Sequence, residues 1–144
     1  MFTVIFCFAY LILLSLCDLF WKKIPNAMLL AFFVSVFCSD ISFAYGTIII
    51  RLLCAIVFSG IFFLVAFFTK GLGAGDVKLA GVLGYCNGFI RTSVILGGAA
   101  VIGILFYIIY SVFKKKISSI PFAPFVLAAF FVYVMLAGRI NEIL

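Results

Sequence analysis

The chain contains no histidine. This absence excludes Ser-His and Cys-His nucleophile pairs and metal sites built on imidazole, so any acid–base catalysis has to use Asp, Glu, Lys or Tyr. Charge is also scarce, because Asp, Glu, Lys and Arg make up 10% of the 144 residues, against roughly 25% in an average soluble domain. Only four residues carry a carboxylate side chain. Very few residues can therefore serve as catalytic acids.

The cysteines lack the spacing of a metal or disulfide framework. There are five of them, an odd number, and no Cys-x-x-Cys occurs. All lie in apolar stretches, where cysteine commonly acts as a small packing residue. We therefore expect neither a structural metal nor a cofactor. The five are Cys7, Cys17, Cys38, Cys54 and Cys86.

What the chain has instead is apolar surface. It is 69% hydrophobic, with a mean hydropathy of +1.49, too much for the core of so short a soluble protein. Lipid must then act as solvent, and continuous apolar runs without period-two alternation favour helices over a barrel. The sequence predicts an all-α polytopic membrane protein, one domain over residues 1–144. The six expected transmembrane helices span approximately residues 2–21, 25–40, 47–69, 76–90, 92–113 and 120–138.

The basic residues cluster at the ends of these apolar runs, as topology signals do, and form no surface suited to nucleic acid. In the six-helix topology, seven lysines collect on one side and three arginines on the other. The side richer in basic residues is expected to face the cytoplasm. This predicts a multi-pass protein of the inner (cytoplasmic) membrane with both termini outside. The lysines are Lys22, Lys23, Lys70, Lys78, Lys114, Lys115 and Lys116; the arginines are Arg51, Arg91 and Arg139.

Two of the carboxylates fall on the same predicted membrane face. Asp18 ends the first helix and Asp76 begins the fourth, whereas Asp40 and Glu142 fall on the opposite side. Acids at the edge of lipid are costly and usually functional. Two carboxyls in contact share one proton, as in aspartic peptidases: one activates water while the other donates to the substrate carbonyl. We expect Asp18 and Asp76 to form such a pair, with no cofactor.

Asp76 follows a glycine-rich break, Gly71-Leu72-Gly73-Ala74-Gly75. Glycines allow backbone angles closed to other residues and let another chain approach closely. Gly73 and Gly75 are therefore candidates for an active-site loop along which an extended substrate could lie. A flexible connection between helices is the simpler interpretation.

Small residues also recur within the predicted fourth and fifth helices, and their spacing predicts close helix packing or room for a substrate helix. They are Ala80, Gly84, Gly88, Gly97, Gly98, Ala99 and Gly103.

Three segments together resemble the type IV prepilin peptidases, which belong to the GxGD class of membrane aspartic peptidases. They are Asp18 with Ile24-Pro25-Asn26, then Gly73-Ala74-Gly75-Asp76-Val77-Lys78-Leu79, then Pro121-Phe122-Ala123-Pro124. The resemblance implies an endopeptidase that cuts the short basic leader of prepilins or pseudopilins after a glycine, at the cytoplasmic membrane face.

The resemblance also implies roles for individual residues. The catalytic pair maps onto Asp18 and Asp76, and the Gly73 to Lys78 segment onto the active site; the other two landmarks carry no assigned chemical step. Larger bacterial members have a cytoplasmic Cys-x-x-Cys segment and also methylate the new N-terminus. That segment is missing here, which points to a compact, peptidase-only form.

Three other interpretations are open at this stage. Lys116 near Ser118 and Ser119 could form a Ser-Lys catalytic pair, although no oxyanion site accompanies them. A small ion- or proton-coupled transporter could use the same two aspartates, but would be expected to carry acids deeper in its spans. A structural assembly protein would explain the glycines but not the acids.

Overall fold

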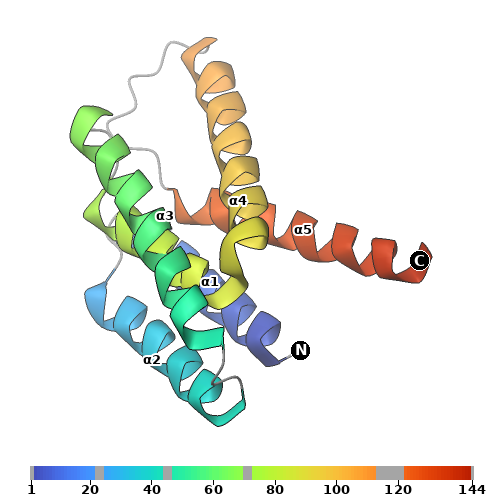
Figure 1. Cartoon of the computed structure of the whole chain (residues 1–144). Coiled ribbons are helices and arrows are strands. Elements are labelled where there is room, and N and C mark those ends of the chain that lie inside the picture. The colour runs from blue at the N-terminus through green and yellow to red at the C-terminus, as the bar shows by residue number, and fades with distance from the viewer. Residues whose placement is uncertain (1, 22–24, 44–46, 70–72, 113–121, 144) are drawn as a thin grey trace.

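Every element of the chain that the structure describes is an α-helix. The structure is a computed structural model that describes residues 2–21, 25–43, 47–69, 73–112 and 122–143. Within these ranges there are five helices, shown in Figure 1, and the prediction of an all-helical chain is confirmed. The helices are α1 (Phe2–Trp21), α2 (Asn26–Phe43), α3 (Ile48–Thr69), α4 (Ala74–Val112) and α5 (Ala123–Ile143).

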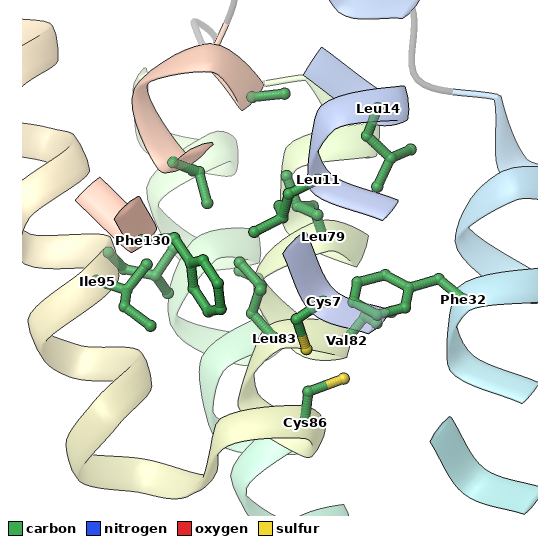
Figure 2. Close-up of a cluster of buried hydrophobic side chains, with 14 of the residues drawn as sticks. Cys7, Leu11, Leu14, Phe32, Leu79, Val82, Leu83, Cys86, Ile95 and Phe130 are labelled. Atoms are coloured by element: carbon green, nitrogen blue, oxygen red, sulfur yellow. The ribbon is translucent and has the colours of Figure 1, made fainter. Parts of the chain in front are cut away.

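The helices pack around one apolar core to which all five contribute. α4 is central: α3 packs along it most extensively, α5 contacts its second half and α1, and α2 contacts both α1 and α4. Figure 2 shows part of the core between α1, α4 and α5. Its largest fully buried side chains include Leu11, Leu14, Phe32, Leu79, Leu83, Tyr85, Ile95 and Phe130.

The fourth and fifth predicted helices form the single helix α4, which bends sharply at Gly88 (Figure 1). Gly88 has φ 72° and ψ −177°, a region of backbone space that is essentially restricted to glycine. The prediction of a break between residues 90 and 92 was therefore wrong in position, and six separate helices become five. The chain needs no loop here, because one glycine reverses its course.

A buried hydrogen bond joins the two halves of α4 across this bend. The Thr92 hydroxyl donates to the Leu83 carbonyl oxygen at 2.9 Å, and the Asn87 side-chain amide donates to the same oxygen at 3.3 Å. A straight helix would hold positions 83 and 92 about 13 Å apart along its axis. The bond is thus specific to the bent form of α4.

Thr92→Val should lower the free energy of unfolding by about 1 kcal/mol, because it deletes this buried hydroxyl and preserves its shape. Denaturant titration in detergent micelles measures the change. Ser93→Ala is the matched control: the Ser93 hydroxyl is exposed and bonds only to the Phe89 carbonyl, one turn earlier. Equal stability of the two variants would contradict a role for Thr92 at the bend.

The outer surface is apolar. Phe20, Phe68 and Ile90 each expose more than three quarters of their surface (79%, 79% and 78%). By length and composition, Ile48–Phe68 and Ala74–Ile109 can each cross a membrane, with mean hydropathies of 2.7 and 2.3. Shorter apolar stretches occupy Ile5–Trp21, Asn26–Asp40 and Ala123–Ala137. Exposed apolar helices of this kind suit a lipid solvent.

One ion pair joins α2 to α3. Arg51, near the start of α3, donates through one guanidinium nitrogen to both carboxylate oxygens of Asp40 at 3.0 and 2.9 Å. Asp40 is buried, so this partner offsets the cost of removing a charge from water. Both carboxylate oxygens of Asp40 are therefore bound to Arg51.

Candidate active site

Asp76 lies in the first turn of α4 and fastens the start of that helix. Gly73 precedes the helix, and its carbonyl accepts the Asp76 and Val77 amides at 3.0 and 3.4 Å. In return, the Gly73 amide donates to Asp76 Oδ2 at 3.1 Å. The bond from the Gly73 amide to the Asp76 side chain is one half of a capping box, with the acid at the third helical position; the other half would need an N-cap side chain, which glycine lacks. One carboxylate oxygen of Asp76 is therefore held by the backbone.

The described glycines beside Asp76 do not have the unusual backbone angles that the sequence predicted. Gly88 is the one described glycine with a positive φ, so Gly73 and Gly75 adopt angles open to any residue. Gly75 is the second residue of α4. At Gly73 the constraint is close approach, because an added Cβ would come within 3.3 Å of Asp76 Oδ2. Gly71 lies outside the described residues.

Asp18 lies in the last turn of α1 and is 7% exposed. Its Oδ2 accepts a hydrogen bond of 3.1 Å from the backbone amide of Ala123, the first residue of α5. The donor comes from 105 positions further along the chain and is itself fully buried. Asp76 is more accessible than Asp18, being partly exposed at the helix start.

The packing of α1 against α4 brings the two acids to the same end of the molecule. In Figure 2, Cys7 of α1 lies next to Cys86 of α4. At 1.5 Å per residue, Asp18 lies about 16 Å along α1 from Cys7, and Asp76 about 15 Å back along α4 from Cys86. The helices are antiparallel, so both distances run the same way (Figure 1). The charges of Asp18 and Asp76 are close enough to interact.

Lys78 connects the active-site segment to the start of α2. Its ammonium group donates to the Asn26 side-chain oxygen at 2.9 Å, an exposed contact between positions 52 residues apart. Asn26 is the first residue of α2. The bond ties the segment around Ile24-Pro25-Asn26 to the helix that carries Asp76; Ile24 itself lies outside the described residues.

Within the described ranges, no three His, Cys, Asp or Glu side chains are grouped closely enough to hold a metal ion. The arrangement at this end of the bundle is thus two carboxyls, one buried and one partly exposed, each with one oxygen bonded to a backbone amide.

The sequence model of the type IV leader peptidase family matches residues 5–109, which include both acids and the Gly73 to Lys78 segment. The chain belongs to this family. Its members are membrane aspartic peptidases, which agrees with the apolar helices of this structure. The comparisons with curated proteins and with solved structures give no match.

Two contacts of this leader peptidase family member were not predicted from the sequence: the Ala123 amide on Asp18, and the Asn26 side chain on Lys78. Both partners lie in segments that carried the family resemblance without an assigned step. Proline next to a helix start marks a place where backbone donors such as the Ala123 amide lack helical partners, but it does not identify the acceptor, and it gives no signal for the Asn26 side chain.

Proposed function

We propose that this protein is a membrane aspartic endopeptidase with Asp18 and Asp76 as its catalytic pair. Its substrates are prepilin-like or pseudopilin precursors, from which it removes the short basic leader after a glycine at the cytoplasmic membrane face. The observation that carries the proposal is the convergence of two acids from distant parts of an apolar chain. The family match, which spans both positions, supports it.

In this mechanism the two carboxyls share one proton. The ionised carboxylate takes a proton from a water molecule as its oxygen attacks the peptide carbonyl carbon, and the protonated carboxyl donates to the carbonyl oxygen. Collapse of the tetrahedral intermediate breaks the C–N bond. The amine leaves with the proton that the first carboxyl had taken up, and the second carboxylate recovers its proton from a hydroxyl of the intermediate as the new carboxyl group forms. These two transfers return the pair to its starting state.

The backbone contacts of the pair suit this chemistry. Each acid has one oxygen held by a fixed amide, from Gly73 or from Ala123, which leaves the other oxygen for water and for the shared proton. Catalytic groups held in one orientation avoid an entropic cost during the reaction. Gly73, Gly75 and Lys78 form the rim of the site in this proposal, along which an extended leader segment would lie.

The proposal extends to topology. The chain is one peptidase domain that crosses the inner membrane six times, with the bend at Gly88 separating the fourth and fifth crossings. The acids face the cytoplasm and both termini lie outside. Since the chain has no Cys-x-x-Cys, we assign it leader removal without N-methylation.

Coexpression with an epitope-tagged prepilin tests the proposal. The precursor should lose its leader, seen as a shift on an immunoblot and as a new N-terminus by mass spectrometry. The single variants Asp18→Asn and Asp76→Asn should each leave the precursor intact. A transporter would be favoured instead if the precursor stays uncleaved when it is expressed with the wild-type chain and if the purified protein in vesicles carries a proton-coupled flux.

A further inference from the structure

The α5 N-terminus supplies the one backbone hydrogen bond to Asp18 that the structure describes, and this donor comes from a distant part of the chain. The hydrogen bond from the Ala123 amide to Asp18 Oδ2 joins the last turn of α1 to the first residue of α5. Both residues are buried, and Ala123 has no exposed surface. The family match ends at residue 109, so Asp18 lies within it and Ala123 beyond it.

The local backbone explains why Ala123 is the donor. The Phe122 carbonyl accepts the amides of Phe125 and Val126 at 3.1 and 3.2 Å, so Phe122 caps the helix and Ala123 is its first residue. First-turn amides have no partner inside a helix. Pro124, in the second position, has no amide hydrogen. Ala123 is therefore the first-turn amide left for another acceptor, and Asp18 supplies the acceptor.

Aromatic contacts hold this turn in place. The ring of Phe122 contacts Phe62 of α3, with ring centres 5.9 Å apart. Phe125 contacts Phe106 of the second half of α4, with ring centres 5.4 Å apart. The first turn of α5 thus rests on α3 and α4 while its amide reaches α1. A donor fixed by two other helices can define the orientation of a carboxylate.

We propose that the Ala123 backbone amide is a positioning group for catalysis. It holds Asp18 Oδ2 so that the other oxygen of Asp18 is presented to the shared proton and to the attacking water. This inference rests on the proposed function, and it assigns a task to the first turn of α5. Ala123 acts through Asp18 and does not itself touch the substrate.

Ala123→Pro removes the amide hydrogen at a position where proline suits the helix, since the first helical residue tolerates its fixed φ. We expect kcat for cleavage of a purified prepilin to fall roughly tenfold to hundredfold, with KM unchanged. Ala123→Gly retains the amide and should restore kcat to within about threefold of the wild type. A wild-type kcat for Ala123→Pro, or a raised KM with unchanged kcat, would overturn the inference.

A second measurement does not depend on cleavage or on how well Ala123→Pro folds. In protein labelled with ¹⁵N-alanine, the Ala123 amide proton should shift upfield in Asp18→Ala and keep its position in Asp76→Ala. An Ala123 resonance indifferent to Asp18→Ala would overturn the contact. If the wild-type chain leaves prepilin uncut while this resonance responds to Asp18→Ala, the proposed function fails and the contact stands.

Discussion

Asp76→Asn should reduce the rate of leader removal by roughly 10³-fold or more, because it deletes one member of an acid–base pair whose two groups act together. The substitution is close to isosteric. Asparagine keeps a side-chain oxygen that can accept the Gly73 amide, so the cap of α4 is preserved. The loss should therefore appear in kcat with normal levels of protein in the membrane.

Asp18→Asn should give a loss of the same size. Its oxygen can still accept the Ala123 amide. Asp18→Ala differs, because it leaves a buried amide without an acceptor and should also cost about 1–3 kcal/mol of folding free energy. Glu142→Gln, the same chemical change at a carboxylate that the sequence assigns to the other face, should cleave normally. Processing retained by Asp18→Asn or by Asp76→Asn would rule out a catalytic pair.

Gly84→Ala should destabilise the protein by about 2 kcal/mol, because it overpacks the contact between α3 and α4. A Cβ at position 84 would come within 2.9 Å of both the Cys54 carbonyl oxygen and a ring carbon of Phe58. The Cys54 carbonyl belongs to the backbone of α3, which cannot turn aside as a side chain can. The two helices must separate, and since α4 carries Asp76, leader removal should fall as well.

The matched control is Gly97→Ala, in the second half of the same helix. A Cβ at Gly97 would meet no atom within 4 Å, and alanine is the better helix former by about 1 kcal/mol. Unfolding by denaturant in micelles should rank Gly97→Ala at or above the wild type and Gly84→Ala well below it. If Gly97→Ala is the less stable variant, or if both variants lose the same stability, the contact between α3 and α4 at Gly84 is not as tight as these distances imply.

The helices could be predicted because the apolar runs are long and uninterrupted. The first three predicted ranges lie close to α1, α2 and α3. The break between the fourth and fifth helices was misplaced because the charged Arg91 lies between two apolar stretches and was taken as the boundary, whereas the chain bends at Gly88. The chain reverses at one glycine, and Thr92 stabilises this bend by a hydrogen bond to the carbonyl oxygen nine residues earlier. Neither feature produces a local pattern of polar residues that would mark the bend in the sequence.

The candidate pair could be predicted because the chain has only four carboxylate side chains, and the predicted topology places only Asp18 and Asp76 on the cytoplasmic face. Their backbone partners could not. The Ala123 amide reaches Asp18 across 105 residues, and a backbone donor has no residue type to mark it. For Gly73 the expected unusual φ was wrong, and closeness to the Asp76 carboxylate is what favours glycine there.

The two acids differ in burial, and this difference implies an order in which a substrate would contact them. On the described surface Asp76 is the accessible member, and Asp18 is buried against the start of α5. An incoming peptide would meet the α4 side first and reach the inner acid last. Inhibitors that mimic the tetrahedral intermediate would then gain most of their selectivity from how far one hydroxyl group reaches past Asp76 towards Asp18. Their design would depend on this depth more than on the peptide sequence that they copy.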